Sequence, residues 1–235
     1  MYLRELIRSD ANNADYRFLQ FCMANAPNST AQLFQDLLPL FLLRPKQPGF
    51  FVEFGATDGV FLSNTLLLES KFQWNGILAE PAQKFHAGLR ANRKAALDFR
   101  CVWSETGRQM PFHEAEDGEL STLDGFGETD HHSALRAKGR KYAVESVSLN
   151  DLLKSHNAPR KIDYLSMDTE GSELEILKAF DFSAYDVSIL TIEHNFLPDY
   201  RAAIHSWMSA AGYDRIFENL SAWDDWYVKR GTKPE

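Results

Sequence analysis

The sequence predicts an α/β fold in which a mostly parallel sheet is covered by helices on both faces, with a helical extension at the N-terminus. The first observation is that short apolar runs alternate with segments of helical periodicity from residue 50 onward. The second is that the last two apolar runs are too close together for a helical crossover, so we expect them to pair antiparallel. The length of 235 residues suits one large domain with an added segment.

Composition and charge disfavour several classes of protein. With 33 acidic and 25 basic residues, the chain has a formal net charge of -8, and such a chain gains nothing from the field of a nucleic acid. The longest apolar run, at residues 37–43, is broken by Pro39 and is far shorter than the roughly 20 residues that span a bilayer. We therefore expect neither a nucleic-acid partner nor a membrane span.

The cysteine content and the N-terminal residues both bear on the cell compartment. Cys22 and Cys101 are too few for a disulfide framework or a zinc cluster. The first residues lack the basic and apolar regions of a signal peptide. Together these features favour a reducing cytoplasm.

Residues 1–48 are predicted to form the helical extension. Apolar side chains cluster on one face of residues 16–23, and a second helix, capped by Ser29 or Thr30, is expected to follow. Prolines and a glycine then end the helical pattern. The main domain is therefore placed at residues 49–235.

The main domain is predicted to alternate strands with helices. Seven strands are expected, at residues 50–54, 77–80, 97–103, 162–168, 187–193, 216–217 and 226–228. The expected helices lie at 63–72, after Pro81, at 152–153, at 173–180 and at 200–211. The polar segment 104–141 is much longer than an ordinary connection, so we predict a lid or acceptor-binding loop there.

The most informative motif, Glu-Phe-Gly-Ala-Thr-Asp-Gly at residues 53–59, ends the first predicted strand. Gly55 and Gly59 permit a tight turn that a ligand can approach closely, and ligands of open parallel sheets lie beyond the carboxyl ends of the strands. Glu80 ends the second strand, where a carboxylate can accept both hydroxyls of a ribose. This order of strand, glycine turn, helix, strand and acid predicts a nucleoside-cofactor site. In the alternative interpretation, Gly55 and Gly59 only form a turn and Glu80 is an exposed strand end.

The chemistry of the glycine turn favours one cofactor over another. A nicotinamide dinucleotide is typically bound by G-x-G-x-x-G, with its pyrophosphate at a helix N-terminus. Here the third glycine is missing and Asp58 lies inside the turn, where it would repel a pyrophosphate. An acid suits the ammonium or sulfonium group of S-adenosylmethionine, which has no phosphate.

Five motifs, in this order along the chain, carry a resemblance to a known family; they lie at residues 50–59, 63–65, 76–81, 163–171 and 192–195. They resemble the FkbM family of S-adenosylmethionine-dependent methyltransferases over about residues 32–228, and the block from Asp168 to Glu173 is the most specific part. The resemblance implies a class I methyltransferase (Rossmann-like) fold, whose seven-stranded sheet has an antiparallel last strand. It also implies S-adenosylmethionine as cofactor and O-methylation of a hydroxyl on a sugar or another small natural product.

The resemblance further implies which residues bind the cofactor. Glu53, Gly55 and Asp58 would line its methionine part, and Glu80 would bind the ribose. Ser104, just past the third strand, would approach the adenine. The complete expected set is Glu53, Gly55, Asp58, Gly59, Asn64, Glu80, Pro81, Ser104 and Asp168.

The expected catalytic residues are Asp168, Glu170 and His194. Asp168 and Glu170 follow the fourth strand and would face the methyl group and the acceptor, although acids there also suit the start of a helix. His194 follows the fifth strand, as a general base or as a structural residue. In another interpretation, Asp168, Glu193 and Asn195 bind Mg²⁺ or Mn²⁺, which would lower the pKa of a bound hydroxyl.

Two other functions compete with methyl transfer. One is a nicotinamide-dependent oxidoreductase or epimerase with a Rossmann-like fold. The other is a partner subunit that keeps the methyltransferase fold without catalysis. The expected partner is a small-molecule or saccharide acceptor, and a homo-oligomer is among the assemblies left open.

Overall fold

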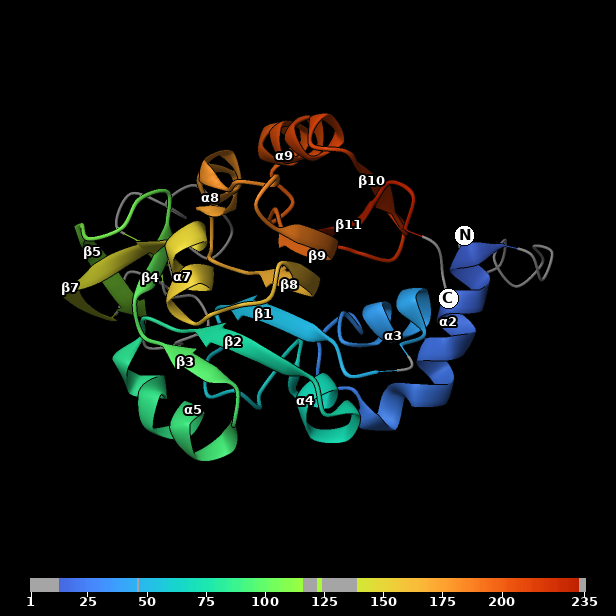
Figure 1. Ribbon diagram of the computed structural model, residues 1–235, viewed down its shortest axis with the longest axis horizontal. Coiled ribbons are helices and arrows are strands. Elements are labelled where there is room, and N and C mark those ends of the chain that lie inside the picture. Colours follow the sequence, from blue (N-terminus) through green and yellow to red (C-terminus); the bar gives the residue numbers. More distant parts are fainter. Residues whose placement is uncertain (1–12, 46, 116–121, 124–138, 233–235) are drawn as a thin grey trace.

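A seven-stranded sheet forms the centre of the protein (Figure 1). The computed structural model describes residues 13–45, 47–115, 122–123 and 139–232. In spatial order, the strands are β10 (Tyr213–Ile216), β11 (Asp224–Lys229), β9 (Asp186–Glu193), β8 (Lys161–Met167), β1 (Phe50–Phe54), β2 (Asn75–Ala79) and β3 (Ala96–Asp98). All neighbours from β9 to β3 are parallel, whereas β11 is antiparallel to both of its neighbours. The expected sheet with an antiparallel last strand is confirmed.

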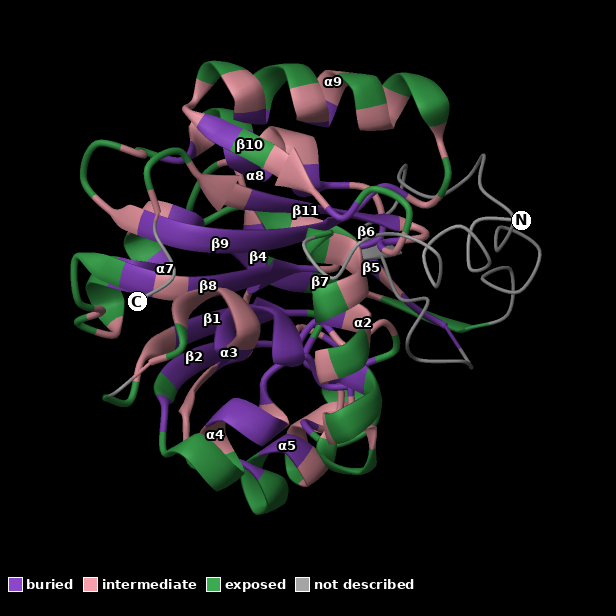
Figure 2. Cartoon of the chain, turned by 90° about the vertical axis from the view of Figure 1, so that its right-hand side faces the viewer, coloured by how far each residue is buried: buried purple, intermediate pink, exposed green. Residues whose placement is uncertain are grey.

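Helices cover both faces of this sheet (Figures 1 and 2). Val52 and Leu165 point to one face, where they share a core with α7 (Leu149–Ser155), α8 (Glu173–Ala179) and α9 (Pro198–Ala210). Phe51 and Tyr164 point to the other face, where they pack with α2 (Ala14–Asn25), α3 (Leu37–Leu43), α4 (Leu66–Phe72) and α5 (His86–Asn92). Because successive strand residues point to opposite sides, every strand supplies both cores. We call these sides the α9 face and the α3 face.

A second, smaller sheet lies beside the first and was not predicted. Its strands, in spatial order, are β4 (Cys101–Trp103), β7 (Gly139–Ser148), β5 (Gln109–Ala115) and β6 (Thr122–Leu123). The single strand predicted at 97–103 was wrong, because β3 and β4 belong to different sheets. Arg100 donates both from its backbone and from its guanidinium to Asp98, and this local bond stabilises the bend between them.

The predicted lid at 104–141 is therefore partly β-structure. Strands β5 and β7 pair antiparallel. Gln109 lies opposite Glu145 at one end of the pairing, and Ala115 lies opposite Gly139 at the other. Residues 116–121 and 124–138 lie outside the described part of the chain, so the lid itself stays a prediction. Among the described helices, none is long and apolar enough to cross a bilayer.

The helical extension differs from its prediction in one respect. Its second helix, α3, begins at Leu37 and not after Thr30. Ser29 and Thr30 do not cap that helix; the Ser29 hydroxyl and the Thr30 amide both donate to the buried Asp36 carboxylate, at 2.6 and 3.2 Å. The local competition of side-chain and backbone hydrogen bonds thus delays the helix by about two turns.

Gly76 offers a direct test of the packing between β1 and β2. A Cβ built there would overlap the Phe51 ring and lie 2.6 Å from the Phe51 carbonyl oxygen. We expect Gly76→Ala to lower the free energy of unfolding by about 1–3 kcal/mol, and the melting temperature by roughly 2–4 °C per kcal/mol. Gly107→Ala is the control, because its added Cβ meets nothing within 4 Å and only its positive φ of 87° adds strain. An unchanged melting temperature for Gly76→Ala would contradict this packing.

Candidate active site

Acidic side chains gather at the carboxyl edge of the main sheet, on the α3 face. Glu53 lies near the end of β1, Asp168 follows β8, and Glu193 ends β9. Glu193 lies opposite Asp224 in the antiparallel register of β9 and β11. Glu53, Glu193 and Asp224 are buried, and Asp168 is half-buried.

Two of these acids, Asp168 and Glu193, form a compact group with Glu170, and we call these three residues the carboxylate cluster. Each offers one carboxyl oxygen within 4.8 Å of the others. The Asn195 amide nitrogen donates to Glu170 at 3.1 Å and to Glu193 at 3.0 Å. The structure therefore brings together four residues that the sequence placed at two different strand ends.

The charge state of the cluster is set by burial and by neighbouring acids. Burial raises the pKa of Asp168 well above its usual range, and the negative charges of Glu170 and Asp224 raise it further. The pKa of Glu193 is raised in the same way, by burial and then by Asp168. Burial also raises the pKa of Asp224 to about 7, although a hydrogen bond from Gln35 opposes the shift. These acids hold protons at a pH where exposed carboxyls are ionised.

The glycine turn after β1 lies against the cluster. Gly55 is exposed and has a φ of +74°, and a Cβ there would clash with the Asp168 carbonyl oxygen. Only glycine fits this close approach of two strand ends. Gly59, with a φ of +79°, ends the turn and is buried against Leu89 and Arg93.

Glu53 and Asn64 form a buried polar network beside the turn. Glu53 accepts from the Asn64 amide at 2.8 Å and from the Thr65 hydroxyl, and the Arg93 guanidinium lies 3.8 Å away. The Asn64 side-chain nitrogen donates to Ser166 at 2.9 Å. The side-chain oxygen of Asn64, by contrast, is buried without a hydrogen-bond partner among the described residues. Asn64 thus has one acceptor to offer to a ligand.

The remaining predicted cofactor residues lie in the turn after β1 and directly after β2 and β4. Glu80 accepts backbone hydrogen bonds from Thr57 at 2.8 Å and Ala82 at 2.7 Å, and burial raises its pKa to about 7. Asp58 accepts from the Val60 and Phe61 amides, both at 2.9 Å, so it stabilises its own turn. The half-buried Pro81 and Ser104 follow β2 and β4.

His194 is not brought together with the carboxylate cluster. It follows Glu193 directly, so its side chain points to the opposite, α9 face. Nδ1 accepts from the Phe196 amide at 3.1 Å, and Nε2 lies 3.8 Å from Asp225. Burial lowers the pKa of His194, which favours neutral imidazole.

Comparison with known proteins identifies the family. A model of the methyltransferase FkbM domain matches residues 53–215, which is more than half of the chain. The chain belongs to the FkbM methyltransferase family. The resemblance carried by the motifs is thereby confirmed, and none of the curated proteins matches this sequence.

Two solved structures are similar to this FkbM-family chain. One is methyltransferase FkbM from Methylobacillus flagellatus KT, with 12% identity and a TM-score of 0.49. That match covers 91% of this chain but 59% of the other, so this chain spans less than two thirds of that protein. The second is precorrin-6y C5,15-methyltransferase from Geobacter metallireducens GS-15, with 11% identity, a TM-score of 0.44, and coverage of 82% and 85% of the two chains.

Two residues near the site of this FkbM-family protein were missed from the sequence. Asp224 lies opposite Glu193, and alternation along the last strand could have placed it on the same face. Gln35, in the extension, donates to Asp224 at 2.9 Å. No local pattern could have found a contact between residues so far apart in the sequence.

The raised pKa of Asp224 predicts how stability changes with pH. The folded-state pKa of about 7 exceeds the ordinary value of 3.8, so stability is lost as pH rises through about 7. We expect Asp224→Asn to raise the melting temperature at pH 8 by roughly 5–10 °C, corresponding to on the order of 3 kcal/mol, and to change it little at pH 4. Thermal unfolding at both pH values measures this. The exposed Asp214→Asn is the control, and an equal change at both pH values would contradict the assignment.

Proposed function

We propose that this protein transfers a methyl group from S-adenosylmethionine to a hydroxyl group of a small molecule. The observation that carries the proposal is the group of buried acids at the carboxyl edge, whose strongest charge interactions are with other acids. A cationic ligand complements such a group, and S-adenosylmethionine carries an ammonium and a sulfonium. Family membership supports methyl transfer independently.

The residues present fit this cofactor. Gly55 presents exposed backbone beside Asp168, and the unpartnered Asn64 oxygen can accept from an ammonium group. We propose that Gly55 and Asn64 contact the methionine part of the cofactor. Glu53, Asp58 and Gly59 would line the same part of the site. Glu80 would take the ribose through the lone pairs that its two backbone hydrogen bonds leave, and Pro81 and Ser104 would flank the adenine. When bound, the cofactor supplies an electrophilic methyl group on a positively charged sulfur.

The chain then has to orient the acceptor hydroxyl and take its proton. We propose that Asp168, with Glu170 beside it, accepts the proton once binding of the cationic cofactor has ionised the Asp168 carboxyl, whose pKa is raised in the free protein. Asn195 holds Glu170 and Glu193 in place. Alignment of the hydroxyl with the methyl group supplies the larger part of catalysis.

His194 and a metal ion are the alternatives for the deprotonation. His194 would need to turn away from Asp225, because its ring faces the α9 side. Asp168, Glu193 and Asn195 were predicted to bind Mg²⁺ or Mn²⁺, and the spacing of Asp168, Glu170 and Glu193 is compatible with one ion. Loss of activity in EDTA, restored by either ion, would favour the metal.

The acceptor class and the setting are also proposals. A hydroxyl on a sugar or another small natural product suits the family resemblance, and the two buried, free cysteines are consistent with a cytoplasmic protein. Two features oppose a nicotinamide cofactor: the third glycine is missing, and Asp58 lies in the turn. A non-catalytic partner subunit is the remaining alternative, and methyl transfer by the purified protein would exclude it.

Two substitutions separate the candidate bases. We expect Asp168→Asn to lower the rate of methyl transfer by about 10²–10⁴-fold, with the dissociation constant of S-adenosylhomocysteine changed less than tenfold. His194→Gln is expected to keep the rate within tenfold. Transfer of labelled methyl from S-adenosylmethionine to a panel of glycosides measures both, and Asp214→Asn is the control. The reverse ranking would make His194 the base, and no transfer by any form of the protein would favour the partner subunit.

A further inference from the structure

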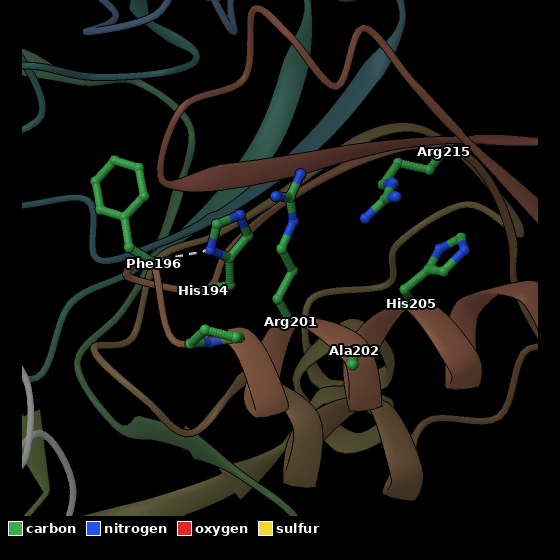
Figure 3. Close-up of a pocket in the computed structure, with 7 residues that line it drawn as sticks. His194, Phe196, Arg201, Ala202, His205 and Arg215 are labelled. Atoms are coloured by element: carbon green, nitrogen blue, oxygen red, sulfur yellow. Dashed lines mark hydrogen bonds between the residues drawn. The ribbon is translucent and has the colours of Figure 1, made fainter.

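A pocket opens on the α9 face, away from the carboxylate cluster (Figure 3). Its volume is about 350 Å³, and its lining includes His194, Phe196, Arg201, Ala202, His205 and Arg215. The segment that follows β9, helix α9 and strand β10 surround it. Figure 3 shows both guanidinium groups and both imidazole rings directed toward the same space.

The pocket and the carboxylate cluster are on opposite faces of the sheet. Glu193 and His194 are neighbours in the chain and point to opposite sides, and so do Asp224 and Asp225 of β11. Tyr227, on the side of Asp225, belongs to the same core as Ile204 of α9. A ligand in this pocket therefore does not occupy the proposed cofactor site.

The pocket has more positive than negative charge inside. Arg201 donates to the buried Asp225 carboxylate at 2.7 Å, and Arg215 donates to it at 3.1 Å. The other nearby acid, Glu218, pairs with Arg215 at 2.6 Å but is half-exposed, at 51% of its side chain. The guanidinium groups of Arg201 and Arg215 thus share one buried carboxylate, and the second acid, Glu218, contacts Arg215 from the solvent side.

Three polar atoms of the lining have no hydrogen-bond partner among the described residues. They are Nε2 of His194, Nδ1 of His205 and Nε of Arg215, and all three are buried. Nε of Arg215 always carries hydrogen, and Nε2 of His194 carries it because Nδ1 already accepts from Phe196. Buried donors without partners are costly in a folded protein. Two unpaired donors beside two cations are the arrangement that an anionic oxygen would satisfy.

We propose that this pocket binds the oxyanion of a small molecule, such as a phosphate or sulfate group. Arg201 and Arg215 supply the charge, and the nitrogens of His194 and Arg215 supply directed donors. The volume of about 350 Å³ is at the lower end of the range for small-molecule sites, so it accommodates an oxyanion with a modest organic group. The oxyanion belongs either to a free effector or to the acceptor itself.

Ala202 allows the proposal to be tested without removing a buried contact. It is exposed on α9 and lines the pocket, so Ala202→Glu adds a negative charge at the mouth while keeping a good helix former. Titration calorimetry of the full chain with inorganic phosphate, at constant ionic strength in chloride, measures binding. We expect the wild type to bind phosphate, and Ala202→Glu and Arg215→Gln to weaken binding at least tenfold. Ala210→Glu, exposed at the other end of the same helix, is expected to bind like the wild type.

Two results would overturn the proposal: no phosphate binding by the folded wild type, or equal binding by wild type and Ala202→Glu. Circular dichroism shows whether each variant is folded. Glucose 6-phosphate, titrated with and without S-adenosylhomocysteine, separates the two sources. Tighter binding when S-adenosylhomocysteine is present indicates an acceptor, and unchanged binding indicates an effector. S-adenosylhomocysteine binding by Ala202→Glu reports on the cofactor site separately, so failure of one site is distinguishable from failure of the other.

Discussion

Glu193 and Asp224 face each other across the antiparallel pair of β9 and β11, and Asp168 lies beside Glu193. Like charges directly opposite in a strand pair are unfavourable, and burial makes ionised carboxyls more costly still. The surrounding chain offsets this with neutral donors: Gln35 to Asp224, and Asn195 to Glu193. Neutral donors stabilise a carboxylate less than a cation does, so the pKa values of Asp168, Glu193 and Asp224 stay raised.

This constraint explains why the helical extension is part of the site. Gln35 comes from the extension, and Asp36 next to it is anchored by Ser29 and Thr30. The Thr30 hydroxyl also donates to the Ser63 carbonyl at 2.8 Å, in the loop that holds Glu53. Helices α2 and α3 share a core with the strands of the α3 face. The extension therefore forms a wall of the acidic edge and is not an independent appendage.

Local patterns predicted most of the main sheet, because β1, β2, β8 and β9 are short apolar runs that end at, or are followed by, an acid or glycine. The same patterns placed Glu53, Asp168 and Glu193 at one edge. They failed where the decisive contacts are distant in sequence: the pairing of β4 with β7, and the bond from Gln35 to Asp224. The position of His194 is a different kind of error, because the local pattern was sufficient to place it. Strict alternation after Glu193 already places its ring on the other face, but the catalytic expectation was based on its strand end alone.

The central claim is that the acidic edge is completed by a cationic cofactor, and proton release on binding tests it most directly. Calorimetry at pH 7 in buffers of different ionisation enthalpy counts the protons released. We expect S-adenosylmethionine to release protons, and to release more than S-adenosylhomocysteine, which lacks the sulfonium charge. Because a cation lowers the pKa of nearby carboxyls, affinity should also rise between pH 6 and pH 8. Binding of S-adenosylmethionine without proton release, or tighter binding of NAD than of either compound, would contradict the account.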